Sequence, residues 1–231
     1  MSLAADIHAL RTRTITDLVS AHDYYTETKE AWRLLRREIA AGRRLKVRYD
    51  VTGSVTTQEE LVERSRVYVV DELASSTFQQ FLSIFEAFLF DFLGLWLAAY
   101  PQSLSGKKVD FRAVLELPDK QAIIRLVVGR ELNEVLYERP SGWFDYLEER
   151  AQLGYPSPEE IGRIAEAKAT RDVFVHNRGI ANNSYLAKAG ELARVAVGEF
   201  AELPGPYHRA VWDLLRKVVA DIADAALAKL N

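Results

Sequence analysis

The apolar segment at residues 78–100, FQQFLSIFEAFLFDFLGLWLAAY, is the feature that most restricts how this chain folds. It is nearly long enough to cross a bilayer as one helix. Four polar side chains interrupt it: Gln79, Gln80, Glu86 and Asp91. Because a carboxylate at membrane depth costs about 2.5–3.5 kcal/mol, the segment is better explained as the central helix of a protein core. We therefore expect no membrane partner.

Composition narrows the class of protein further. The chain has 231 residues, of which 48% are hydrophobic and 27% charged, which suits one globular unit. Its net charge of −3 excludes a highly basic nucleic-acid coat protein, so any nucleic-acid contact must depend on a local patch. The absence of cysteine removes disulfides, iron–sulfur clusters and thiol catalysis. With no signal-peptide pattern at the N-terminus, we expect a cytoplasmic location.

Helix start and stop signals cover most of the chain. Thr57 with Glu60, and Ser157 with Pro158 and Glu160, form capping boxes that open helices. Helical patterns occupy residues 6–39, 58–100, 121–137, 143–153, 158–178 and 211–230, and the second of these either continues through residues 75–76 or breaks there. Residues 45–51 alternate like a short strand, and residues 193–198 allow another. We predict an all-α, up-and-down helical bundle at 64–231, with an N-terminal helical extension at 1–63 that allows a short β-hairpin.

The common catalytic and phosphate-binding motifs are missing. The sequence has no G-x-x-x-x-G-K-[ST], no G-x-G-x-x-G and no G-x-S-x-G. Its four histidines show no H-x-x-x-H spacing. We therefore expect no cofactor and no metal.

Residues 167–190, AKATRDVFVHNRGIANNSYLAKAG, gather charged and amide side chains at the end of one helix and in the following loop. Asp172 and His176 are four residues apart and share a helix face, so the Asp can orient the imidazole. Arg171 and His176 are separated by about 140° around an ideal helix, and converge only if the helix bends or a second chain contributes. A charged helix end stopped by Gly179 is also an ordinary structural feature.

This segment resembles a known family. Arg171-Asp-Val-Phe-Val-His176 is similar to the R-x4-H signature of the HEPN superfamily (higher eukaryotes and prokaryotes nucleotide-binding). The continuation at residues 176–186, His-Asn-Arg-Gly-Ile followed by Asn-x-x-Tyr-Leu, resembles its RiboL-PSP-HEPN branch. The resemblance covers residues 64–230. It implies an all-α bundle that dimerises and brings two motifs into one cleft.

The resemblance further implies a metal-independent endoribonuclease of toxin–antitoxin, phage-defence or RNA-processing systems, although other members only bind nucleotides or proteins. In that reading His176 transfers protons, Arg171 stabilises phosphate charge and Asp172 completes the catalytic set. The chemistry agrees, since the RNA 2′-OH is an internal nucleophile and the enzyme need only move protons and stabilise charge. The expected partners are RNA, a second copy of the chain and, in a toxin–antitoxin setting, an antitoxin protein.

Other polar residues are secondary candidates. Glu86 could reach Arg171 and orient it, or face water in a polar stripe with Gln79 and Ser83. Asn177 is a candidate supporting residue. Three further side chains are candidate RNA contacts, with ordinary surface or structural roles as the alternative: Arg178, Lys188 and Tyr185.

A basic cluster lies far from the motif in the sequence. Six basic side chains within residues 33–48 form a candidate phosphate track, or a helix end followed by an exposed strand: Arg36, Arg37, Arg43, Arg44, Lys46 and Arg48.

Overall fold

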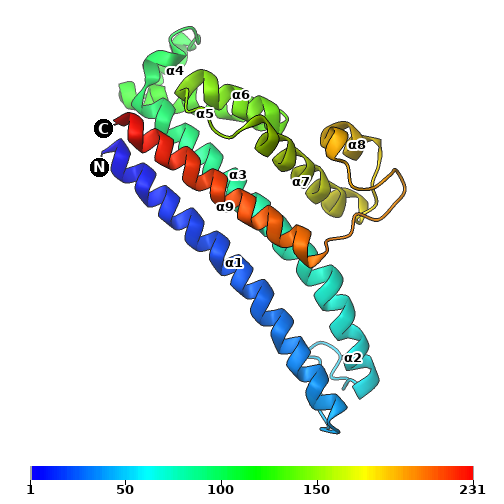
Figure 1. The fold of residues 1–231 in the computed structure, drawn as a ribbon. Coiled ribbons are helices and arrows are strands. Elements are labelled where there is room, and N and C mark those ends of the chain that lie inside the picture. Colours follow the sequence, from blue (N-terminus) through cyan, green and yellow to red (C-terminus); the bar gives the residue numbers. More distant parts are fainter. Residues whose placement is uncertain (1, 231) are drawn as a thin grey trace.

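The apolar segment forms the centre of the fold. The computed structural model describes residues 2–230, and helix α3 (Leu73–Ala99) runs through the middle of the helical body. Helices α1 (Leu3–Ala40) and α9 (Gly205–Leu230) pack along α3, and α1 runs antiparallel to both (Figure 1). The prediction of an all-α helical bundle is confirmed.

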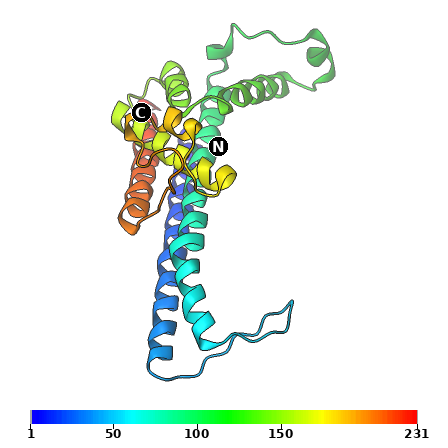
Figure 2. The ribbon, with the colours of Figure 1, turned by 90° about the vertical axis from the view of Figure 1, so that its right-hand side faces the viewer.

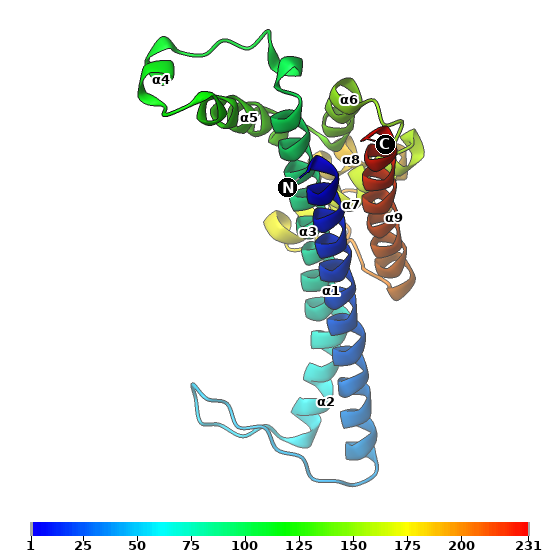
Figure 3. The ribbon, with the colours of Figure 1, turned by 90° about the vertical axis from the view of Figure 1, so that its left-hand side faces the viewer.

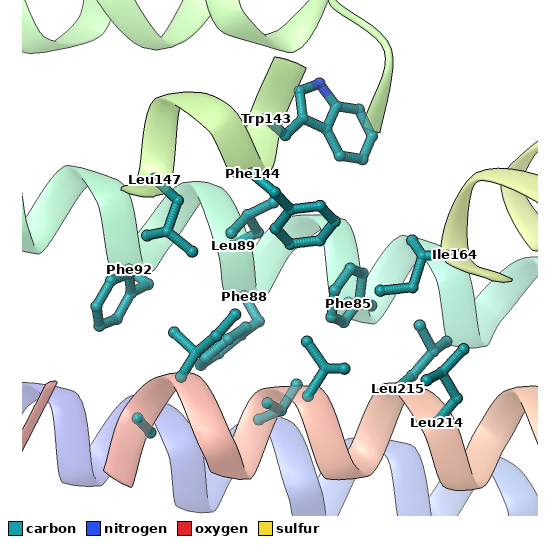
Figure 4. Close-up of a cluster of buried hydrophobic side chains, with 14 of the residues drawn as sticks. Phe85, Phe88, Leu89, Phe92, Trp143, Phe144, Leu147, Ile164, Leu214 and Leu215 are labelled. Atoms are coloured by element: carbon teal, nitrogen blue, oxygen red, sulfur yellow. The ribbon is translucent and has the colours of Figure 1, made fainter. Parts of the chain in front are cut away.

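Aromatic side chains on α3 fill the core. Phe85, Phe88 and Phe92 are at most 1% exposed, and they face Leu215 of α9 and Phe144 of α6 (Pro140–Ala151) (Figure 4). Burying each such side chain contributes about 1.5–3 kcal/mol. Among the described helices, α3 is also the one whose length and composition would allow a membrane span, and 50% of that window is buried in this fold.

The helix that begins after Thr57 does not break before the apolar segment. Helix α2 (Gln58–Val67) starts at the predicted capping box and passes into α3 through a π-helical turn (Tyr68–Glu72). On α1, no described residue beyond Tyr25 is buried. Residues 26–40 and 58–72 therefore form a thin two-helix extension, which we call the stalk (Figure 2).

The loop at the end of the stalk, residues 41–57, is the tip loop. The predicted strand at 45–51 is not formed, because an isolated antiparallel bridge between Arg48 and Val55 is the extent of the pairing in the described loop. Most side chains of the tip loop are exposed, so a longer pair of strands would have no hydrophobic surface to pack against. The predicted boundary between residues 63 and 64 falls inside α2. The first half of α1 contributes Ile7 and Leu18 to the main core, so it packs as part of the bundle.

Two smaller groups of helices complete the fold. Helices α4 (Phe111–Glu116) and α5 (Lys120–Leu136) project sideways from the top of α3 (Figure 3). Helix α7 (Pro158–Asn177) packs against α3, α6 and α9, and α8 (Asn183–Ala189) lies on its outer side (Figure 1). Residues 193–198, the second expected strand, form an irregular connection. The isolated bridge described nearby joins Ile180 to Phe200, outside that range.

Candidate functional site

The motif helix α7 starts and stops where its sequence signals predict. Ser157 accepts a hydrogen bond from the Glu160 amide at 3.3 Å, and the Glu160 carboxylate accepts one from the Ser157 amide at 2.8 Å. At the other end, Arg178 (φ 52°) and Gly179 (φ 79°) take left-handed backbone conformations that end the helix. The C-terminal half of α7 thus presents the Arg171–His176 motif in one uninterrupted helix.

Glu86 of α3 lies directly against the motif arginine. Nη2 of Arg171 donates to both carboxylate oxygens of Glu86, at 2.7 and 2.8 Å, and Nζ of Lys168 donates to the same carboxylate at 2.8 Å. Each of the three side chains is 18% exposed. Of the two alternatives for Glu86, the structure shows the contact with Arg171. A charge-assisted bond from a rigid core helix fixes the guanidinium in place at the edge of the protein surface.

Asp172 contacts a different partner from the predicted one. Its carboxylate accepts a 2.9 Å hydrogen bond from Nζ of Lys188 on α8 and lies 3.4 Å from Nη1 of Arg171. Within residues 2–230, no hydrogen bond or ion pair joins Asp172 to His176, so the predicted orienting contact is absent from this structure. The reason is that α8 folds back against α7 and brings an ammonium group to the carboxylate.

His176 occupies the last turn of α7 and is exposed. In the described part of the chain, no protein group makes a hydrogen bond or ion pair with its ring. Arg171 is meanwhile held against α3, and helix α7 is uninterrupted between the two residues. On a continuous helix, residues five positions apart differ by about 140° around the axis, and no hydrogen bond joins these two side chains within residues 2–230.

The remaining candidates separate into surface and structural residues. Arg178 is exposed, and Lys188 is 40% exposed while paired with Asp172. Asn177 donates to the Ile180 carbonyl at 2.5 Å and caps the helix end. Tyr185 was a candidate RNA contact, but it is 1% exposed, so it cannot reach RNA in this structure. Its hydroxyl accepts a 2.9 Å hydrogen bond from the Arg194 amide, which makes it a packing residue.

Sequence reasoning missed a buried polar network behind the motif. Glu166 on α7 is 5% exposed and accepts from Thr170 Oγ1 at 2.8 Å, Arg194 Nε at 2.9 Å and the Tyr207 hydroxyl at 2.6 Å. The Arg194 guanidinium lies 3.6 Å from the Tyr207 ring centroid. Burial, and then the Glu166 carboxylate, raise the pKa of Tyr207 far above its ordinary value. This Glu166 network joins the 193–204 connection to α7 and α9. The spacing of four residues between Glu166 and Thr170 is the signal in the sequence that could have indicated part of it.

A pocket of about 420 Å³ lies beside the end of α7, and its lining includes neither Arg171 nor His176. Phe174 and Phe200 give it an apolar wall, while Asp71 and Glu202 give it negative charge. Such a lining does not suit a phosphate group. Among residues 2–230, no group of three or more His, Cys, Asp or Glu side chains is placed to hold a metal ion.

No protein-family model matches this chain, and comparison with curated proteins and with solved structures gave no significant match. These comparisons therefore do not test the resemblance to the HEPN superfamily, which consists of the motif residues alone.

Proposed function

We propose that this protein is a metal-independent endoribonuclease whose site is built on the end of α7. The observation that carries the proposal is the clamped arginine: Glu86 holds Arg171 with two short hydrogen bonds, while the exposed ring of His176 lies further along the same helix. A held guanidinium and an exposed imidazole are the two groups that RNA transesterification needs.

In this reaction the 2′-OH of RNA attacks the adjacent phosphorus. One imidazole removes the hydroxyl proton, Arg171 stabilises the developing negative charge on the phosphate oxygens, and a protonated imidazole donates a proton to the leaving 5′-oxygen. The products are a 2′,3′-cyclic phosphate and a 5′-hydroxyl. Asp172 acts in this scheme through Arg171 and Lys188, which are its contacts, and not through His176.

The chemistry requires both an acid and a base, and each chain has one motif histidine. A symmetric homodimer supplies two copies of His176 and two of Arg171 around one phosphate. The surface beside His176 supports such an interface, because Val175 is 46% exposed and Ile180 is 36% exposed. Mixing inactive Arg171→Ala chains with inactive His176→Ala chains should restore part of the activity if the site is shared between subunits.

The resemblance to HEPN proteins supplies the proposed setting. It supports a toxin–antitoxin, phage-defence or RNA-processing system, with an antitoxin protein as partner in the first of these. The cytoplasmic location that we propose follows instead from the cysteine-free composition. The contact between Glu86 and Arg171 supports the proposed chemistry, and the resemblance alone supports the proposed setting.

Cleavage of RNA in the presence of EDTA tests the function. His176→Ala should lower the rate by about 10²–10⁴-fold, the usual contribution of general acid–base catalysis, while the exposed His8→Ala should leave it unchanged. Arg171→Ala should also abolish activity, and Arg163→Ala on the same helix is its matched control. Dependence on added Mg²⁺ or Mn²⁺, or equal activity of His176→Ala and His8→Ala, would contradict the mechanism.

One observation favours a second candidate, a non-catalytic HEPN module that binds a nucleotide or a protein. Arg171 already contacts two carboxylates, those of Glu86 and Asp172, so its charge is neutralised within the fold. Glu86→Gln distinguishes the two functions. In a nuclease it should lower cleavage about tenfold by releasing the guanidinium, with little change in stability because the site is partly exposed. If the ion pair is only structural, neither the wild-type protein nor the Glu86→Gln variant should cleave RNA.

A further inference from the structure

The end of α1 and the start of the tip loop together carry the strongest basic cluster in the sequence. Residues 33–48 contain seven basic side chains and one acidic side chain, in a chain whose net charge is −3. The stalk carries this segment away from the body of the protein (Figures 2 and 3). The charge is therefore concentrated at one end of the molecule, far from the motif helix.

Most of these positive charges have no carboxylate partner. Arg33 pairs with Glu30, and Arg43 with Glu38 at 2.7 Å. Within residues 2–230, no ion pair involves the other five basic side chains: Arg36, Arg37, Arg44, Lys46 and Arg48. Three of these five are exposed on the tip loop itself: Arg44, Lys46 and Arg48. We call these three residues the tip patch.

The tip loop is held in shape although it lacks regular strands. The Tyr49 amide donates to the Ser54 carbonyl at 2.9 Å, and the Thr56 amide donates to the Val47 carbonyl at 3.0 Å. The Arg64 guanidinium lies 4.9 Å from the ring centroid of Tyr49 and donates to its hydroxyl, which anchors the loop on α2. The tip patch is thus presented by a defined loop, so binding it orders less of the chain.

We infer that the tip patch binds backbone phosphates of the RNA whose cleavage is proposed above, and that it acts as a second contact distant from the motif. Glu86 and the start of α2 at Gln58 are separated by 28 helical positions, which is about 40 Å at 1.5 Å per residue. The tip patch can therefore contact the same RNA only when that RNA is long enough to span the stalk. This inference rests on the proposed function, since it selects long RNA as the substrate of that site.

RNA explains the surface better than an anionic membrane does. Arginine forks and lysines without carboxylate partners match phosphate oxygens in either ligand. Membrane-binding elements also need a bulky apolar face with Trp, Phe or Leu. Val51, at the end of the tip loop, is 98% exposed but stands between Asp50 and Thr52. Val47 and Val55 are the other exposed large apolar side chains of the described tip loop, so its exposed apolar surface consists of valines and includes no Trp, Phe or Leu. The tip loop therefore offers charge without the bulky apolar face that insertion requires.

Binding of labelled RNA by the full-length His176→Ala protein tests the inference without cleavage. The RNAs are an unstructured strand of about 30 nucleotides and one of about four, which is too short to reach both sites. The tip variant is Arg44→Gln/Lys46→Gln/Arg48→Gln. Its matched control is Lys120→Gln/Arg125→Gln/Arg130→Gln, which removes the same charge from exposed positions on α5.

The tip variant should bind the long RNA at least about tenfold more weakly at low salt. Its slope of log affinity against log salt should fall by about 2, because each lost phosphate contact on a single strand contributes about 0.7. The short RNA and the control variant should be unaffected. Equal salt slopes for the tip variant and its parent would overturn the inference, as would an equal loss of affinity for both RNAs.

Three further outcomes separate the alternatives. If the tip variant loses binding to phosphatidylserine-containing vesicles and keeps its RNA affinity, the membrane explanation replaces this one. If wild-type protein cleaves RNA while the tip variant keeps its affinity for the long strand, the tip inference alone fails. If wild-type protein neither cleaves nor binds any RNA, the proposed function fails together with it.

Discussion

The end of α7 and the tip of the stalk are both rich in basic side chains, but only one of them balances its charge. At the end of α7, Arg171 and Lys168 contact Glu86, and Lys188 contacts Asp172. At the tip, Arg44, Lys46 and Arg48 have no ion-pair partner in the described chain. Paired charges hold a side chain in one position, whereas unpaired charges remain available for phosphates. The first arrangement suits a reactive site and the second a binding surface.

The two regions also differ in how they are supported. Behind the motif, the Glu166 network is buried and joins α7, α9 and the 193–204 connection. The stalk has two helices and few buried side chains beyond Tyr25. Substitutions in the buried Glu166 network should therefore change the stability of the whole protein, and comparable substitutions in the stalk should not.

The largest expected effect is that of Glu166→Ala. It leaves the Arg194 guanidinium and the Tyr207 hydroxyl without their carboxylate in a largely buried site, which should lower the free energy of unfolding by about 3–5 kcal/mol. The matched substitution at the tip is Glu38→Ala, which removes an exposed pair with Arg43 and should change stability by at most about 1 kcal/mol. Urea unfolding followed by circular dichroism measures both. Similar losses of unfolding free energy in the two variants would contradict the proposed difference between the buried network behind the motif and the stalk.

Local signals in the sequence predicted much of this fold. Both capping boxes and Gly179 correctly placed the ends of helices, because these signals act through neighbouring residues. The Glu86–Arg171 contact was predicted as one of two alternatives. Contacts between distant segments were not predicted. Lys188 takes the carboxylate of Asp172 because α8 folds back on α7, and Arg194 joins Glu166 across 28 positions. No periodic pattern encodes such pairings.

The packing of α9 against the first turns of α3 provides the next prediction. His208 is 0% exposed, and its Nε2 lies 2.9 Å from Thr77 Oγ1. Because Thr77 donates its own proton to the Leu73 carbonyl, Nε2–H of His208 is the donor to Thr77 Oγ1. Nδ1 is buried without a hydrogen-bond partner within residues 2–230. Burial lowers the pKa of His208 to about 4, with the charges of His22 and Lys29 acting in the same direction. Below that pH the ring must be protonated in an apolar site.

Proton binding by His208 determines whether the free energy of unfolding rises or falls with pH. Between pH 6.5 and about 4 the unfolded chain binds a proton at His208 that the folded chain does not, so stability falls as the pH falls. The full loss is about 3 kcal/mol, and His22, whose pKa burial also lowers, adds to it in the same direction. The free energy of unfolding measured from pH 7 to pH 4.5 should fall less steeply in His208→Gln than in the exposed His8→Gln. Parallel slopes in the two variants would show that His208 is not the group responsible.

The smallest effect compares one glycine from each region. Gly179 ends α7 and Gly42 follows the end of α1, and both have a positive φ, of 79° and 87°. Alanine at either position should cost about 1–2 kcal/mol for the left-handed backbone. A Cβ on Gly179 would also lie 2.4 Å from Cε2 of Phe200, whereas a Cβ on Gly42 would meet no atom within 4 Å.

Phe200 is 42% exposed, so its ring can move outward, but it would then lose its edge contact with Phe174. We therefore expect Gly179→Ala to cost about 1–3 kcal/mol more than Gly42→Ala in urea unfolding. The shift of Phe200 should also loosen the connection that pairs Ala201 with Gly179 behind the motif, so Gly179→Ala should lower RNA cleavage while Gly42→Ala should not. Equal unfolding free energies of Gly179→Ala and Gly42→Ala would mean that the end of α7 accommodates the added methyl group as easily as the tip loop does. The rigid support argued for Arg171 would then have to come from Glu86 alone.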